Sequence, residues 1–371
     1  MALSSIEKLI MSTQSTAYSI LELAVVSEGN SIPETFKNAL SLARRAEGLG
    51  YKRFWVSEHH NTISACSCSP PVVVGHLAAG TKSIRVGSGG VMLPNHSPLV
   101  VAEQFGTLGS LYPNRIDLGI GRAPGTDEAT IAAIRSDFME ASRSFPSELE
   151  KIQRYFSKEN ETSSVRATVA EDVDVPLFLL GASSGSARLA AERGLPYAFA
   201  SHFAASQLFN ALETYRNEFK PSSTFAKPYA MAAVNVIIAD TDEKAGSMFT
   251  SLLRMFVDLA TKDQNYLQPP TEFTDKILSA SKHPALQQMT KYTFVGSKDR
   301  VKAQLEEFLR KTAVDEVIAV TPTYDHQDRL RSYELLAEIM GEINAEKKLA
   351  DPASEEKPLS PYEVNAGVVE I

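Results

Sequence analysis

The chain has 371 residues, of which 43% are hydrophobic and 22% charged, as in an ordinary globular enzyme. The formal net charge is −8 without a block of like charge, which argues against nucleic acid and anionic membranes as main partners. The N-terminal residues lack the basic start and long apolar run of a signal peptide, and no apolar run is long enough to cross a bilayer. We therefore expect a cytoplasmic protein.

Short apolar segments alternate with amphipathic patterns of helical period, and eight of these segments are predicted to be strands. In chain order they are Ser19–Ala24, Arg53–Ser57, Ile84–Ser88, Ile116–Gly121, Pro176–Leu180, Tyr197–Ala200, Ala233–Ile238 and Val317–Val320. Eight strands with helical crossovers predict an α/β protein with a closed (β/α)8 TIM barrel. An open doubly wound sheet is the alternative.

Two insertions are predicted, one after strand four and one after strand seven. The first is a polar helical stretch from about 127 to 161, and the second, from 241 to 293, is rich in aromatic residues and Met. The second insertion is the candidate lid over the active site. Residues 1–345 are expected to form a single domain, with the polar residues 346–371 as a tail or an arm on a neighbour.

The carboxyl ends of the strands should meet at one mouth of a parallel barrel, where functional groups gather. Strand two runs directly into Glu58, His59 and His60, which cannot lie inside a buried strand without a large desolvation cost. Because successive side chains of a strand point to opposite faces, one histidine is expected in the site and the other in support, which argues against a metal site. Glu58 would orient a ring or pair with a basic residue. His96, further along, is either a mouth residue or an ordinary turn residue.

The strand-five exit places Ala182, Ser183 and Ser186 before an Ala-rich helix, and this pattern fits either a phosphate cradle or a serine cap. Arg122, after strand four, could bind the same phosphate or form an ion pair with Asp127. Gly89 and Gly90 end strand three without the G-x-G-x-x-G spacing of a dinucleotide site. They would let a flat group approach the backbone, or form a bulge.

Several of these segments together resemble the bacterial luciferase-like flavin monooxygenases, over roughly residues 17 to 342. The motifs are Phe54–His60, Val86–Pro94, Gly119–Arg122, Gly194–Tyr197 and Tyr292–Gly296. The branch that fits best is the single-chain luciferase-like oxidoreductases. The resemblance implies a barrel that uses reduced FMN, with NAD(P)H as ultimate reductant, to insert one oxygen atom of O2 into a small organic substrate through a flavin C4a-hydroperoxide. It also implies a homodimer and a possible separate flavin reductase.

Carried over residue by residue, the resemblance gives His59 as the active-site histidine near the flavin, with His60 as its neighbour. Gly89–Gly90 would be a non-proline cis peptide against which the isoalloxazine ring packs. The phosphate would bind Arg122, the hydroxyls of Ser183 and Ser186, and the backbone of Ala182. The chain departs from the luciferase subunit at Gly121, where that subunit has a reactive cysteine, and near His202, where it has a tryptophan.

Other functions stay open at this point. A deazaflavin-dependent oxidoreductase could use the same barrel without oxygen, and a non-catalytic flavin-binding protein could store or sense flavin. A metal-dependent barrel hydrolase is disfavoured by the adjacent histidines.

Overall fold

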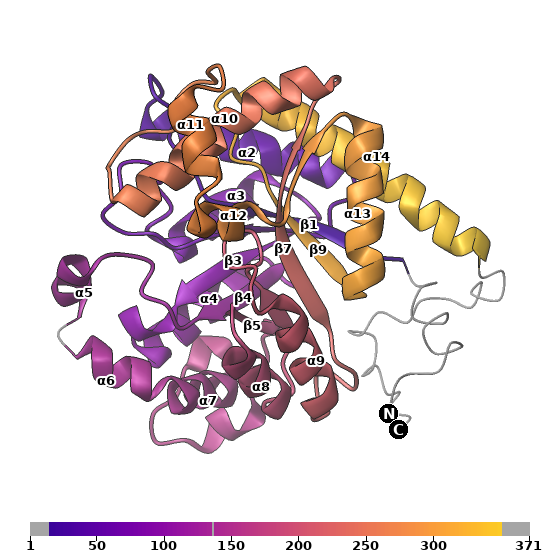
Figure 1. Ribbon diagram of the computed structural model, residues 1–371. Helices are drawn as coiled ribbons and strands as arrows, with labels where there is room; N and C mark the ends of the chain where they lie inside the picture. The colour runs from indigo at the N-terminus through magenta and orange to yellow at the C-terminus, as the bar shows by residue number, and fades with distance from the viewer. Residues whose placement is uncertain (1–14, 136, 351–371) are drawn as a thin grey trace.

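The computed structural model describes residues 15–135 and 137–350, and its centre is a closed barrel of parallel strands (Figure 1). The barrel strands are β1 (Ala17–Glu22), β2 (Arg53–Val56), β3 (Arg85–Met92), β4 (Ile116–Gly121), β5 (Leu177–Gly181), β6 (Tyr197–Phe199), β7 (Ala230–Ile238) and β9 (Glu316–Val320). They pair in this order, and β9 returns to β1, so the ring is complete. The predicted (β/α)8 barrel is confirmed, and the open sheet is wrong because β6 pairs with β7.

A short strand that the sequence did not predict closes the second insertion, which therefore extends past its predicted end at residue 293. This strand, β8 (Thr293–Gly296), pairs with residues 235–238 at the outer end of β7 and extends the sheet beyond the closed ring. With four residues inside a mixed segment, it gives too little periodicity to be recognised. Strand β7 also begins at Ala230 rather than Ala233, because Ala and Met at its start have weak strand preference.

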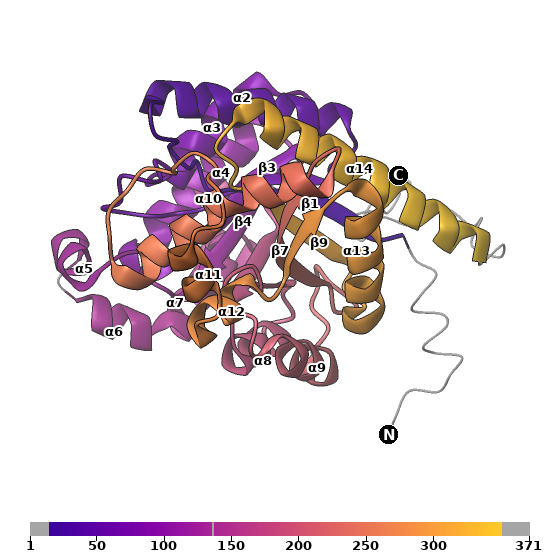
Figure 2. The ribbon, with the colours of Figure 1, turned by 45° about the horizontal axis from the view of Figure 1, so that its top comes forward.

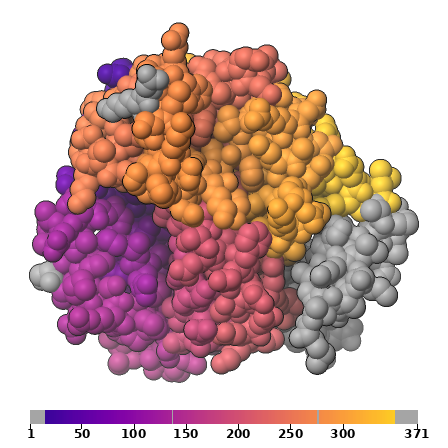
Figure 3. All heavy atoms as spheres, in the orientation of Figure 1, coloured from indigo at the N-terminus to yellow at the C-terminus, as the bar shows by residue number. Residues whose placement is uncertain are grey.

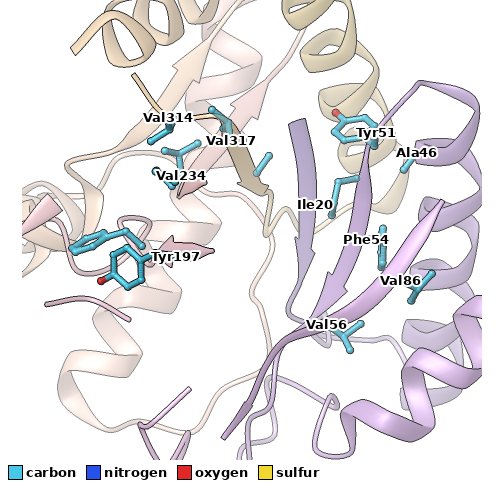
Figure 4. Close-up of a cluster of buried hydrophobic side chains, with 14 of the residues drawn as sticks. Ile20, Ala46, Tyr51, Phe54, Val56, Val86, Tyr197, Val234, Val314 and Val317 are labelled. Atoms are coloured by element: carbon cyan, nitrogen blue, oxygen red, sulfur yellow. The ribbon is translucent and has the colours of Figure 1, made fainter. Parts of the chain in front are cut away.

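The helices form an outer layer around the strands. They are α2 (Ile32–Gly48), α3 (Pro70–Gly80), α4 (Pro98–Leu111), α7 (Phe145–Tyr155), α8 (Ser184–Glu192), α9 (Leu208–Glu218), α13 (Lys298–Thr312) and α14 (His326–Ala350). Phe54 and Val56 of β2 face this layer, together with Val86 of β3 (Figure 4). Helix α14 continues to Ala350, past the predicted domain end, and residues 351–371 of the predicted tail lie outside the described residues.

The insertions follow β4 and β7, as predicted. The first contains α5 (Glu128–Ile134), α6 (Phe138–Arg143) and two 3-10 turns, Lys158–Thr162 and Thr168–Ala170. The second contains α10 (Asp242–Thr261), α11 (Asp275–Ser281), α12 (Pro284–Thr290) and β8. Figure 2 shows α10, α11 and α12 side by side over one end of the barrel.

The barrel interior is charged at the amino ends of the strands and apolar above them. Buried Arg53 forms ion pairs with Asp117 at 2.7 Å and Glu316 at 2.8 Å. Trp55, two residues along β2 and therefore on the same face, donates to Asp117 Oδ2 at 3.0 Å. Its ring packs edge-on against Phe178, at 5.0 Å between centroids. This apolar layer supports the mouth at the carboxyl ends.

Candidate functional site

Glu58 organises the loops that follow β2 and β3. Its side chain is fully buried and accepts hydrogen bonds at Oε1 from His60 Nε2 (2.8 Å), His96 Nε2 (2.9 Å) and Asn95 Nδ2 (3.0 Å). The Met92 amide donates to Oε2 at 2.9 Å. Burial alone would raise the pKa of Glu58, but the hydrogen bonds from His60 and His96 lower it to about 2. Glu58 is therefore an ionised acceptor that orients its neighbours, one of the two roles expected from sequence.

The structure separates the two adjacent histidines. His60 binds Glu58, whereas His59 turns its Nδ1 to Ser57 Oγ at 3.0 Å and donates its backbone N–H to the Ser67 carbonyl at 3.1 Å. Burial lowers the pKa of His59, although the Glu58 carboxylate acts in the opposite direction. His59 is thus a neutral ring at neutral pH.

His202 follows β6 and is the second neutral imidazole of this end of the barrel. It is 9% exposed, and its buried Nδ1 has no hydrogen-bond partner within residues 15–135 and 137–350. Burial lowers the pKa of His202 to about 3, and the nearby His59 ring contributes to this shift. A buried polar atom without a partner is costly, so this nitrogen is suited to a polar group of a bound molecule.

Gly89 and Gly90 lie in the second half of β3, which continues to Met92 and so does not end at the glycines as predicted. The peptide bond between them is cis, as the resemblance implied. A Cβ at Gly89 would lie 2.8 Å from Leu21 Cδ1 and 3.0 Å from Trp55 Cβ, and one at Gly90 would lie 2.8 Å from the Gly119 carbonyl oxygen. A side chain at either position would therefore collide with neighbouring strands, which accounts for the two glycines; the packing of a flat ligand on this backbone stays a prediction.

Arg122 lies at the same end of the barrel, directly after β4. Ile120 is paired with Leu179 of β5, so continuation of this register places Arg122 level with Gly181, three residues before α8 begins. Its exposed guanidinium makes no hydrogen bond or ion pair with any residue that the structure describes. The alternative of an ion pair with Asp127 is wrong, because no such pair forms among the described residues; Asp127 accepts from the Thr130 amide and from Asn61 instead.

The loop that carries Arg122 is tied to the histidine loop. The Gly125 carbonyl accepts from the His60 amide at 3.2 Å, and Thr126 Oγ1 donates to the His60 carbonyl at 3.0 Å. These bonds pass over the end of β3, so Arg122 and His59 belong to one connected rim.

The serines after β5 cap helix α8. Ser183 Oγ accepts from the Ser186 amide and Ser186 Oγ accepts from the Ser183 amide, both at 3.3 Å. Ser186 Oγ also lies 2.9 Å from the hydroxyl of Tyr197. Gln207 Oε1 accepts from the Ser184 amide at 3.1 Å. The predicted serine cap is therefore present, and the phosphate role of Ala182, Ser183 and Ser186 stays a prediction.

The second insertion is fastened over the loops after β1 and β2. The Leu267 amide donates to the Val26 carbonyl at 2.9 Å, and the Glu28 amide donates to the Leu267 carbonyl at 2.8 Å. Exposed apolar side chains lie on loops after β2, β6 and β7, namely Ile63, Phe203, Tyr266 and Phe273. Figure 3 shows a hollow where the N-terminal part of the molecule meets the orange insertion.

A separate cavity of about 840 Å³ lies between the start of α10 and residues 270–273. Of the site residues named above only Phe273 lines it, and none of the predicted catalytic or phosphate-binding residues does, so we do not assign the site to it. Within the described ranges, no helix is long and apolar enough to cross a membrane. The same ranges contain no group of three or more His, Cys, Asp or Glu arranged as metal ligands.

Three functional candidates escaped the sequence analysis. Ser57 contacts the His59 ring, and Ser67 contacts Ser57. Gln207 accepts from the first turn of α8. Ser57 directly precedes Glu58, His59 and His60, and this position could have identified it as a site residue. Ser67 and Gln207 approach through folding, and nothing in their local sequence marks them.

Comparison with known proteins places these features in a family. The sequence model described as luciferase-like monooxygenase matches residues 16–316. The uncharacterized protein YvbT of Bacillus subtilis (strain 168) is 49% identical over 325 residues, covering 87% of this chain and 96% of YvbT. A luciferase-like monooxygenase of Escherichia coli (strain K12) is 44% identical over 333 residues, covering 90% and 99%.

Solved structures agree with this match. Apo-MsnO8 aligns with a TM-score of 0.80 and 36% identity, covering 88% of this chain and 98% of that one. More distant structures share the fold alone. They include the oxygenating constituent of 3,6-diketocamphane monooxygenase from Pseudomonas putida in complex with FMN (TM-score 0.66, 18% identity, covering 89% and 98%). They also include an F420-dependent secondary alcohol dehydrogenase (TM-score 0.65, 15% identity, covering 88% and 99%).

Proposed function

Since the chain belongs to the luciferase-like monooxygenase family of flavin-dependent oxygenases, we propose that it uses FMN to insert one oxygen atom of O2 into a small organic substrate. The observation that carries the choice of FMN is the exposed Arg122 guanidinium, which is free of protein partners among the described residues and follows β4 at the level of Gly181, where β5 leads into α8. Proteins commonly bind phosphate with a guanidinium or at a helix N-terminus.

The residues around Arg122 fit the rest of the cofactor. The isoalloxazine ring would lie on the bare backbone of Gly89 and Gly90, above the layer that contains Trp55. His59 and His202 would face it from the loops after β2 and β6. Both rings are neutral at neutral pH because burial lowers the pKa of each, so they add no charge to the pocket.

The chemistry divides between the cofactor and the protein. Reduced FMN, when bound, supplies the electrons that activate O2. The protein binds the phosphate, positions the ring and excludes water, and His59 holds or accepts a proton at a ring nitrogen. Glu58, which binds His60 and His96 at one oxygen, keeps the loop after β2 in place.

The exposed apolar side chains near the mouth favour an apolar substrate. Ile63, Phe203 and Tyr266 come from loops that follow three different strands. Loops at this end of a barrel form the substrate site in enzymes of this architecture. We therefore propose that apolar aldehydes or ketones are better substrates than sulfonates. From the family resemblance we also propose NAD(P)H as the ultimate reductant, acting through a separate reductase, and a homodimer in the cytoplasm.

A binding titration with a matched pair of arginine variants tests the cofactor. Trp55 is the only tryptophan of the chain, so quenching of its fluorescence reports a flavin bound above it. Arg122→Ala should weaken FMN by about 1.5–3 kcal/mol, the range for hydrogen bonds to charged groups, and leave riboflavin, which has no phosphate, unchanged. Arg188→Ala, which removes an exposed arginine of α8 that is paired with Glu218, is the control.

Equal loss of FMN and riboflavin, or no loss of FMN, would overturn the phosphate assignment. Tighter binding of F420 than of FMN by the wild-type protein would favour a deazaflavin-dependent oxidoreductase instead. Incorporation of ¹⁸O from labelled O2 into an aldehyde or ketone, dependent on reduced FMN, tests the monooxygenase reaction. Flavin binding without oxygen uptake on any such compound would leave a flavin-binding protein.

A further inference from the structure

The Nδ1 side of the His59 ring begins a chain of buried hydroxyls. Ser57 Oγ lies 3.0 Å from His59 Nδ1 and 3.0 Å from Ser67 Oγ, and Ser67 Oγ donates to the Leu23 carbonyl at 3.1 Å. Ser57 is 3% exposed and Ser67 is fully buried, so water does not compete for these groups.

The carbonyl at the end of this chain fixes the direction of every hydrogen bond in it. A carbonyl can only accept, so the single proton of the Ser67 hydroxyl goes to Leu23. Ser67 Oγ must then accept from Ser57, and Ser57, having given its proton away, must accept from His59. The hydrogen therefore lies on Nδ1 of His59, and Nε2 carries the lone pair.

The groups around His59 are compatible with this neutral form. Glu58 and His60 lie on the same loop, but the Glu58 oxygens already accept from His60, His96 and other donors. His202, from the loop after β6, is held neutral because burial lowers its pKa to about 3. Burial also lowers the pKa of His59 itself, with Glu58 acting against the shift. No neighbour therefore forces a second proton onto the ring.

We propose that Ser67, acting through Ser57, is a positioning residue that fixes His59 as the Nδ1–H tautomer, so that Nε2 accepts a proton or hydrogen bond from the reacting group. The role of Nε2 rests on the proposed function, whereas the tautomer itself does not. Ser67 holds His59 twice, because its carbonyl also accepts from the His59 amide at 3.1 Å.

The hydroxyl chain orients the ring and does not conduct protons. A proton that reached Ser67 could go no further, because the Leu23 carbonyl has no exchangeable hydrogen to pass on. Any proton that His59 accepts at Nε2 must therefore leave again through Nε2, to the bound molecule or to solvent. His59 therefore accepts and releases a proton at Nε2 and does not pass it on through the serines.

Nitrogen NMR on the protein without flavin tests the tautomer directly. In ¹⁵N-histidine-labelled protein at pH 8, long-range proton–nitrogen spectra distinguish a protonated ring nitrogen from a bare one. His59 is one of seven histidines, and its signals are assigned by their loss in His59→Gln. We expect wild-type His59 to carry hydrogen on Nδ1, and hydrogen on Nε2 would overturn the proposal without any further variant.

Two serine variants then identify Ser67 as the cause. In Ser67→Ala the Ser57 hydroxyl loses its acceptor and should donate to Nδ1, which moves the histidine hydrogen to Nε2. Ser67→Thr keeps the hydroxyl and should keep the wild-type tautomer. Ser64→Ala, which removes a hydroxyl bonded to Thr62 in the same loop, is the control. An unchanged tautomer in Ser67→Ala would contradict the role of Ser67.

Turnover and flavin binding separate this proposal from the function on which it rests. Ser67→Ala should lower kcat by roughly tenfold or more, within the range for a misplaced acid–base group, and leave the Trp55 quenching by FMN unchanged. If wild-type protein binds no FMN, the proposed function fails while the NMR result stands. If FMN binds and kcat of Ser67→Ala equals that of wild type, the function stands and the role of Nε2 fails.

Discussion

Arg53 and Asp117 form an ion pair of 2.7 Å inside the barrel, and neither side chain is more than 1% exposed. Arg85 adds a second cation to Asp117, and the Arg53 guanidinium lies 4.7 Å from the centre of the Phe178 ring. The charges therefore lie directly below the apolar layer that supports the proposed flavin site. Burial would raise the pKa of Asp117, but Arg53 and Arg85 hold it below its usual range.

Removal of the Asp117 charge should destabilise the whole barrel. Asp117→Asn leaves two cations with too little negative charge in a low-dielectric interior, and breaking a buried pair in this way costs about 3–5 kcal/mol. The midpoint of urea unfolding should fall by the corresponding amount without a change in slope. Asp137→Asn, which breaks an exposed pair with Arg135, should move the midpoint little, and an equal shift in both variants would refute the argument.

The Glu58 carboxylate should make the free energy of unfolding fall at low pH. Its pKa falls from an ordinary 4.5 to about 2 on folding, since hydrogen bonds from His60 and His96 outweigh the effect of burial. A carboxyl whose folded pKa is depressed stabilises the protein above its unfolded pKa and loses that contribution as pH falls toward the folded one. The contribution is about 3 kcal/mol at neutral pH.

The measurement is the free energy of unfolding of wild type and Glu58→Gln between pH 7 and pH 2. The difference between the two proteins should be constant above about pH 5 and shrink below it, through the window from 4.5 to 2. Glu47→Gln is a useful comparison, because its carboxylate also has a pKa lowered to about 2 but is only partly buried. If the difference in free energy of unfolding did not change with pH, the charge of Glu58 would not contribute to stability.

The sequence predicts the barrel well because each barrel strand is a short apolar run, and such runs carry a clear signal. It predicts Glu58 and His59 at the mouth because a carboxylate and two adjacent imidazoles in the middle of a buried strand would carry a large desolvation cost. It does not predict that Arg53 and Asp117 are buried together, since each appears in its own strand as an ordinary charged residue. Their pairing is created by barrel closure, which brings the inward faces of β2 and β4 within reach of one another.

The role of Ser67 could not be predicted either, because folding brings it to its partner. It is ten residues from Ser57 and lies between two cysteines, in a segment without periodicity. Only the return of the loop after β2 brings its hydroxyl to Ser57. The local sequence therefore predicts the functional residues that follow strands, such as His59. The residues that orient them, such as Ser67, are recognised only in the folded structure.

Turnover should depend on a neutral His59. A histidine whose pKa is lowered by burial gains a proton only below about 6.5, so kcat/KM should be flat above neutral pH and fall as pH drops through the pKa of His59. His59→Ala should bind FMN as wild type does and lose most oxygenation, by roughly a hundredfold or more. His76→Ala, at an exposed position of α3, is the control. Full turnover in His59→Ala would remove the ring from the chemistry.

Gly89 and Gly90 of β3 should differ in their tolerance of a methyl group. An alanine Cβ at Gly90 would lie 2.8 Å from the carbonyl oxygen of Gly119, and this backbone atom of β4 cannot move without distorting the barrel. At Gly89 the nearest atom is Cδ1 of the Leu21 side chain, also at 2.8 Å, which can rotate away. Overpacking of this kind costs about 1–3 kcal/mol, and Gly90→Ala should lie at the upper end.

Stability and FMN affinity of both variants measure this difference, with Trp55 fluorescence as the binding signal. Gly90→Ala should lower both quantities, and Gly89→Ala should lower them less. Gly341→Ala, in the exposed interior of α14 with nothing within 4 Å of the added carbon, should stabilise the protein by up to about 1 kcal/mol and leave FMN binding unchanged. If Gly90→Ala binds FMN as tightly as wild type does, the flavin does not pack on this part of β3, because the methyl group displaces the backbone on which the ring is proposed to rest.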